Sequence, residues 1–268
     1  MAFQPTLGRK DPVPDGQRKG SQMRCLQMTS GDRTQIAASL GALIDGLGEV
    51  TPSDLWAPRG FQEPAEIRLD EAQGFIRSAA QRAQLKDWWI APGLMKVRTP
   101  VWDLVSTCHL DGAPGLLLVE AKAHVSELNS DPCTAAEKRN IAQMRAALDE
   151  ATEKWNDLLG AFADARGYKP RTWFDLTPTC HFELGCRLAF ALKIAEMGIP
   201  VALVYLGFLD ADELEDQNCI VFRSEEQWRH FVLEKTKKPA PEELWDETFD
   251  VGGTPLSVLI RSASVELG

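Results

Sequence analysis

Three residues that could hold a divalent cation and activate water lie close together in the stretch Thr99 to His124. Asp103 lies in one apolar run, and Glu120 and Lys122 end a second apolar run with one residue between them. Because side chains alternate along a strand, we expect Glu120 and Lys122 on the same face. Carboxylate and backbone carbonyl oxygens are the ligands that Mg²⁺ prefers, with positions left for water and a phosphate oxygen. These residue types therefore indicate metal-assisted hydrolysis.

The two apolar runs predict a β-hairpin. They cover Pro100 to Leu110 and Gly115 to Ala123, and the residues between them, Asp111 to Pro114, are turn formers. An acid and a base buried together at the end of a strand are costly unless they have a partner or a task. The bland alternative is a solvated Glu120–Lys122 pair of little energetic value.

The order of these residues resembles the motif of the PD-(D/E)xK nuclease superfamily, the restriction-endonuclease-like proteins. Asp103 takes the place of the first acid, and Glu120 and Lys122 form the E-x-K triplet after a hairpin-sized gap. The motif is relaxed, since Pro100 lies three residues before Asp103 and Trp102 takes the adjacent place.

The resemblance implies an α/β fold, a restriction-endonuclease-like α/β/α sandwich with a central mixed β-sheet. It implies a nuclease that uses Mg²⁺, or Mn²⁺ as a substitute, held by Asp103, Glu120 and the backbone carbonyl of Ala121. Lys122 would orient or deprotonate the attacking water. The expected substrate is nucleic acid, with DNA the favoured polymer; endonucleolytic and exonucleolytic cleavage both stay open.

Accessory residues come from the same resemblance. Some of these nucleases carry a further acid on a helix before the hairpin, where Glu71 lies, and a glutamine on a helix after it, where Gln143 lies. Arg187 takes the place of an arginine near the start of a later helix. Two of them have a simpler explanation: the helix dipole favours Glu71 in a first turn, and Arg187 can pair with Glu183 one turn earlier.

His124 is a fourth accessory candidate. It lies two residues after Lys122 and shares its face if the strand persists. From that face it would contact a substrate phosphate, whereas the simpler interpretation is a histidine that ends the strand.

The net charge of −10 argues at first against nucleic acid, because neutralisation of phosphates drives such binding. However, five acids lie between Leu209 and Gln217 and five more between Glu242 and Asp250, and neither segment contains a base. These ten acids equal the whole excess of 39 acids over 29 bases. The rest of the chain is balanced and permits a local basic surface.

Residues 1–32 are rich in Gly, Pro, Gln, Lys and Arg, which is typical of a flexible arm, and residues 33–268 are expected to form one nuclease domain. Apolar spacing and capping residues predict helices near 32–47, 70–85, 134–162, 177–198 and 224–237, a buried strand at 201–206, and a closing strand or helix at 256–260.

No run of about eighteen apolar residues is present, and the first residues lack the apolar segment of a secretory signal, so we expect a cytoplasmic protein without a membrane partner. A homodimer is compatible with the sequence. Two alternatives stay open: a catalytically inactive nuclease-like domain that binds nucleic acid or protein, and an enzyme on another α/β fold in which the hairpin is only core.

Overall fold

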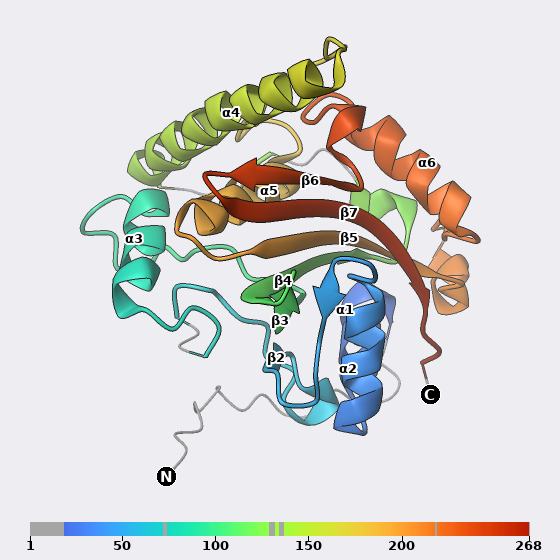
Figure 1. The fold of residues 1–268 in the computed structure, drawn as a ribbon. Helices are drawn as coiled ribbons and strands as arrows, with labels where there is room; N and C mark the ends of the chain where they lie inside the picture. The colour runs from blue at the N-terminus through green and yellow to red at the C-terminus, as the bar shows by residue number, and fades with distance from the viewer. Residues whose placement is uncertain (1–18, 72–73, 129–131, 134–136, 218, 268) are drawn as a thin grey trace.

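A computed structural model describes residues 19–71, 74–128, 132–133, 137–217 and 219–267. The chain is mixed α/β, with a curled mixed sheet whose strands run in the order β1-β3-β4-β5-β7-β6, while β2 pairs with β3 (Figure 1). The strands are β1 Gly48–Glu49, β2 Trp56–Ala57, β3 Leu104–Leu110, β4 Ala113–Lys122, β5 Val201–Leu209, β6 Glu247–Val251 and β7 Thr254–Ser264.

The predicted hairpin is confirmed as β3 and β4. Their antiparallel register pairs Leu104 with Val119 and Leu110 with Ala113. The two turn residues, Asp111 and Gly112, have φ values of 48° and 76°. This left-handed backbone matches the twist of the flanking strands, and it suits Asp followed by Gly. The predicted buried strand is β5, which pairs in parallel with β4 on one side and β7 on the other.

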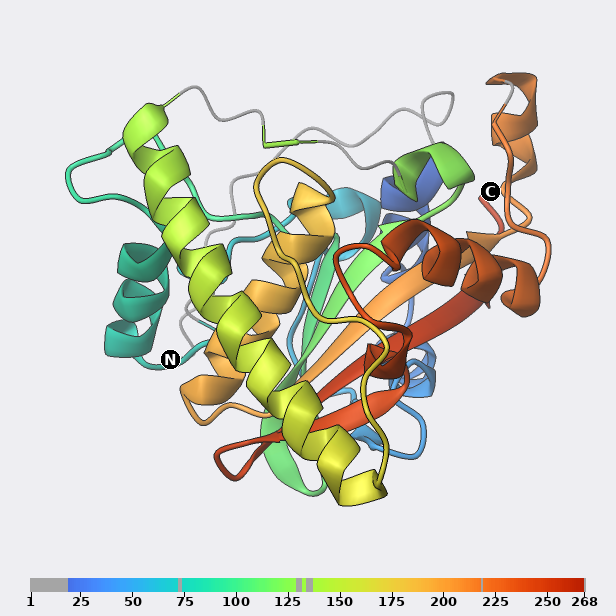
Figure 2. The same cartoon turned by 90° about the horizontal axis from the view of Figure 1, so that it is seen from above.

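Helices cover both faces of the sheet (Figure 1). They are α1 Gly20–Met28, α2 Arg33–Ala42, α3 Ala79–Trp89, α4 Lys138–Arg166, α5 Phe182–Glu196 and α6 Glu225–Thr236, with short 3-10 turns η2 Gly60–Gln62, η3 Val125–Leu128, η4 Asp212–Gln217 and η5 Glu242–Leu244. None of the helices in the described ranges is long and apolar enough to cross a membrane. In Figure 2, α4 runs diagonally over α5, and α5 packs against β5.

Alternation along β4 separates two apolar cores. Leu116 and Leu118 belong to the core on the α5 side, whereas Leu117, Val119 and Ala121 belong to the core on the α2 side. Glu120 and Lys122 have the parity of Leu116 and Leu118, so the strand directs them towards α5. The fold thereby carries two charged side chains into a mostly apolar layer.

Two predicted helices begin later than expected. The start at Asp70 is wrong, because α3 begins at Ala79 after Ser78, whose hydroxyl accepts the Gln81 N–H at 3.3 Å. The expected start at 177 is also wrong, since α5 begins at Phe182. The capping box predicted at residues 134–137 includes residues outside the described ones, and α4 begins at Lys138.

The expected arm differs from the structure between residues 19 and 32, whereas residues 1–18 lie outside the described ranges. Helix α1 packs on the α2 side of the sheet with Met23, Arg24 and Leu26 buried. The Arg24 guanidinium binds the Glu213 carboxylate, with Nη2 2.8 Å from Oε2. These contacts join the first described helix to η4.

A polar contact also joins α3, α4 and α5 on the opposite side of the sheet. The Glu150 carboxylate accepts hydrogen bonds from Trp88 Nε1 at 3.0 Å, Lys154 Nζ at 2.7 Å and Lys193 Nζ at 2.8 Å. Burial opposes ionisation of this carboxylate, but its three donors hold the pKa of Glu150 at about 2. The group thus stabilises the packing of the three helices.

Candidate active site

Asp103 lies beside the end of β4, the strand that carries Glu120 and Lys122. Because Leu104 pairs with Val119, the residue before β3 reaches the level of Glu120. The Asp103 Oδ2 atom accepts the Ala121 N–H at 2.7 Å. The hairpin register therefore brings the first acid of the motif to the backbone of the residue between Glu120 and Lys122.

Four charged side chains form an ion cluster beside Asp103: Glu120, Lys122, Glu183 and Arg187. Lys122 Nζ lies 2.5 Å from Glu120 Oε1 and 2.6 Å from Glu183 Oε2. Arg187 Nε lies 2.5 Å from Glu120 Oε2. Glu120, Lys122 and Arg187 are 1, 6 and 5 % exposed, whereas the Glu183 side chain is 54 % exposed. The cluster therefore reaches solvent through Glu183.

The start of α5 positions Arg187 and Glu183. The two residues lie one helical turn apart, so their side chains project from the same side of α5. The Arg187 guanidinium also lies over the Trp102 ring, 4.6 Å from its centroid. Since Trp102 is fully buried and directly precedes Asp103, this cation–π contact links α5 to the motif.

The charges set the protonation states of the cluster. Burial opposes the ionisation of Glu120, but Arg187 and Lys122 hold its pKa at about 2. Burial alone would lower the pKa of the Lys122 ammonium, yet Glu120 and the other nearby acids hold it well above its usual value. Burial, helped by the Glu120 carboxylate, raises the pKa of Asp103 well above its usual range. Lys122 is therefore a cation at neutral pH.

The residues can accommodate a divalent cation. Among the described residues no three His, Cys, Asp or Glu side chains gather as a ligand set. Mg²⁺ does not need three, because it keeps several waters and is commonly held by one or two carboxylates. The charge is suitable as well: three carboxylates face two cations, which leaves one net negative charge when every group is ionised. Burial is the main cause of the raised pKa of Asp103, and the nearby Glu120 carboxylate adds to it.

Of the four accessory residues, only Arg187 joins the cluster. Glu71 lies in a turn and not on a helix, and its carboxylate is 3.7 Å from Arg98 Nε. Gln143 Nε2 donates to the Trp88 carbonyl at 2.8 Å, which fastens α4 to α3. His124 lies beyond the end of β4, with Nε2 3.8 Å from Glu127 Oε1. For each of these three, the contacts given by the structure explain its position without a part in the site.

Glu183 is the site residue that the sequence reasoning did not select. Its spacing to Arg187 indicated only a local helical pair. The contact that matters joins Glu183 to Lys122, 61 residues earlier in the chain. No local pattern could reveal it, since it depends on α5 docking over the end of β4.

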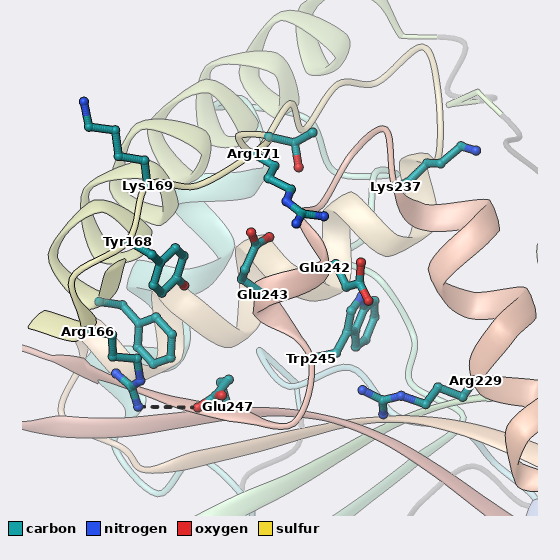
Figure 3. A pocket seen from close by; sticks show the side chains of 12 residues that line it. Arg166, Tyr168, Lys169, Arg171, Arg229, Lys237, Glu242, Glu243, Trp245 and Glu247 are labelled. Atoms are coloured by element: carbon teal, nitrogen blue, oxygen red, sulfur yellow. Dashed lines mark ion pairs between the residues drawn. The ribbon is translucent and has the colours of Figure 1, made fainter. Parts of the chain in front are cut away.

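The pocket that Figure 3 shows lies away from the ion cluster. It has a volume of about 860 Å³ and lies between the end of α4, α6 and η5. Figure 3 shows the cations Arg166, Arg171 and Arg229 interspersed with carboxylates such as Glu243 and Glu247. Its lining includes none of the predicted site residues, so this pocket does not support the proposed active site.

A smaller pocket of about 440 Å³ adjoins the ion cluster, and Glu183 and Arg187 line it.

Comparison of the chain with protein-family models, with curated proteins and with solved structures finds no match, so the interpretation of the site depends on its geometry.

Proposed function

We propose that this chain is a metal-dependent nuclease with a restriction-endonuclease-like core, which hydrolyses phosphodiester bonds in nucleic acid, with DNA the favoured polymer. The observation that carries the proposal is the 2.7 Å hydrogen bond from Ala121 to Asp103 beside the Glu120–Lys122 pair. It holds Asp103 against the backbone between Glu120 and Lys122, at the end of β4. The order β3, β4, helices α4 and α5, then the parallel strand β5, supports the same assignment.

In this proposal Asp103, Glu120 and the carbonyl of Ala121 would hold Mg²⁺ or Mn²⁺. When bound, such an ion polarises a phosphoryl oxygen and lowers the pKa of bound water. Lys122 supplies a fixed positive charge and hydrogen-bond donors, because its nearby acids keep it protonated. Of the two roles expected for it, orienting the attacking water is favoured over deprotonating that water.

Arg187 has a positioning role in the proposal. Its Nε donates to Glu120 Oε2, which fixes the carboxylate in one orientation while Lys122 contacts the other oxygen. Glu183 in turn holds Lys122 from the solvent side of the cluster. Arg187 and Glu183 thus hold the charges of Glu120 and Lys122 in place before the reaction, which would stabilise the charge that develops on the phosphoryl oxygens.

The two acidic segments are partly paired with bases. In the 209–217 segment, Arg223 lies 3.1 Å from Asp210 and 2.5 Å from Asp212, and it also contacts Glu215. In the 242–250 segment, Asp246 contacts both Arg229 and Arg261. Part of the negative charge is therefore neutralised locally, by bases that lie outside the motif.

The test is cleavage by the purified full chain of circular duplex DNA, labelled single-stranded DNA and labelled RNA, with Mg²⁺ or Mn²⁺ and with EDTA. Lys122→Met is expected to lower the rate by at least about 100-fold, as loss of one preorganised donor does in other active sites. Lys193→Met is the matched control, because Lys193 is also a mostly buried lysine in an ion pair, 13 % exposed, but it contacts Glu150 outside the site.

A second function is favoured by one observation: both oxygens of Glu120 already have cationic partners. A nuclease-like domain whose ion cluster is satisfied internally would bind nucleic acid or protein without cutting. Absence of cleavage with every polymer and both metals, in a preparation that binds nucleic acid, would replace the nuclease proposal with this one. Equal rates for Lys122→Met and Lys193→Met would also overturn the proposed role of Lys122.

A further inference from the structure

The smaller pocket is continuous with the ion cluster. Its volume is about 440 Å³, and it lies between the segment 97–101, the end of α3 and the starts of α4 and α5. Glu183 and Arg187 line it and are also members of the cluster. A substrate whose phosphate lies at the cluster would therefore have its neighbouring nucleotide at this pocket.

Asn140 supplies a buried polar group with no partner in the described part of the chain. The residue lines the pocket and is 1 % exposed. Its Oδ1 accepts the Ala91 N–H at 3.0 Å, which fixes the orientation of the amide, and its Nδ2 is buried without a hydrogen bond. A buried donor without an acceptor is costly. A ligand that places an acceptor at this amide would remove that cost.

The pocket also contains aromatic and cationic side chains. Trp89 and Phe182 are stacked, with ring centroids 6.3 Å apart and planes at 25°. Arg68 donates from Nε to the Thr99 carbonyl at 3.1 Å, and Arg98, with a side chain 49 % exposed, stands on the same segment. A guanidinium has five donors, so both arginines retain N–H groups for an anion.

We propose that this pocket binds one unpaired nucleotide of the substrate strand. The base lies against Phe182, and an acceptor on its edge receives the Asn140 Nδ2–H. Arg68 and Arg98 bind the phosphate of that nucleotide. A base within a duplex has its face covered and its edge paired, so the substrate class is single-stranded nucleic acid or a strand with an unpaired nucleotide. This inference rests on the proposed function, which supplies the phosphate at the ion cluster.

The experiment measures binding without cleavage. The full chain is titrated in EDTA against a short fluorescein-labelled single-stranded DNA, against the same sequence as a blunt duplex, and against an abasic strand that keeps the phosphates. The readout is fluorescence anisotropy. We expect the single strand to bind at least about tenfold more tightly than the duplex and the abasic strand, the range expected for stacking of one base.

Two variants have matched controls. Asn140→Asp keeps the acceptor for Ala91 and removes the donor, and it should weaken binding of the single strand by about tenfold more than it weakens binding of the abasic strand. Asn156→Asp makes the same change on α4, at a residue that contacts Phe174 outside the pocket. Arg98→Gln should weaken binding of both strands, whereas Arg171→Gln, in the larger pocket, should leave both unchanged.

Equal affinity for single strand and duplex, or equal effects of Asn140→Asp and Asn156→Asp, would overturn the pocket assignment. These outcomes are separable from the cleavage test. Metal-dependent cutting with no strand preference in binding would support the nuclease proposal and refute the proposal that the pocket binds a nucleotide. Single-strand binding that depends on Asn140, without cutting under any condition, would keep the pocket and favour the binding module.

Discussion

Replacement of Arg187 by methionine tests the ion cluster directly, because it removes one cation from a buried carboxylate while retaining an apolar side chain of similar length. Arg187 is 5 % exposed, and its Nε lies 2.5 Å from the 1 % exposed Glu120. Breaking a buried ion pair by removing one partner costs about 3–5 kcal/mol. Lys122 still contacts the other oxygen of Glu120, so we expect a loss near the lower end, about 3 kcal/mol.

The companion variant is Glu120→Gln. It leaves Arg187 and Lys122 buried, with Asp103 and the half-exposed Glu183 to balance two positive charges. We expect a loss of about 3–5 kcal/mol. In the double variant the unpaired guanidinium is also gone, so the combined loss should be smaller than the sum of the single losses by about 1–3 kcal/mol.

The assay is urea unfolding at pH 7, with the slope against denaturant checked for constancy across the four proteins. Arg171→Met is the control, since Arg171 is exposed on the surface of the larger pocket, and its effect should stay within about 0.5 kcal/mol. Additive single losses, agreeing with the double variant within about 0.5 kcal/mol, would refute the buried contact between Arg187 and Glu120.

Three further predictions concern other positions. Asp103→Asn should abolish cleavage and yet hold or raise stability near pH 7, because the folded state raises the pKa of Asp103; in urea titrations this gain should disappear below about pH 4, where the unfolded chain is also protonated. Glu150→Gln should cost about 1–2 kcal/mol at pH 7, after a discount for a side chain 38 % exposed. The pKa of Glu150 falls from 4.5 to about 2 on folding, so the loss of unfolding free energy in Glu150→Gln should be complete above pH 4.5 and vanish towards pH 2. A loss that does not change with pH would contradict this prediction. Gly207→Ala should lower the free energy of unfolding by about 1–3 kcal/mol, because the added Cβ lies 2.4 Å from Trp228. Gly185→Ala, whose added Cβ has its nearest neighbour at 3.7 Å, should raise the free energy of unfolding by up to about 1 kcal/mol.

The hairpin and the motif could be predicted because their determinants are local. Alternation and a two-residue turn fix which side chains of β4 face α5, and the register then sets Asp103 beside Ala121. The start of α3 could not be predicted in this way. The apolar spacing from Asp70 onwards resembles a helix, but the Asp70 carboxylate accepts a hydrogen bond from Thr99, a partner 29 residues away.

The same distinction separates the members of the site. Arg187 was selected from its place on a helix, and Glu183 entered only as its neighbour. The geometry that joins Lys122 to Glu183 depends on where α5 crosses β4, which no pattern within α5 encodes. The prediction of Glu71 and Gln143 rests on the resemblance and that of His124 on strand alternation, and Gln143 shows the weakness of such placement, because its amide holds α4 against α3 instead.

Helix α1 has a consequence for the order in which the chain can fold. Its contact with Glu213 spans 189 residues, and Ser21 Oγ donates to Glu127 Oε1 across 106 residues. At a synthesis rate of roughly 5–20 residues per second, α1 emerges from the ribosome roughly 10–40 s before Glu213 does. During that interval Met23 and Leu26 can contact Phe61 but not Leu267, which packs against the same cluster and emerges later still. Helix α1 therefore docks late, and a nascent chain that ends before η4 exposes both α1 and the sheet surface it later protects.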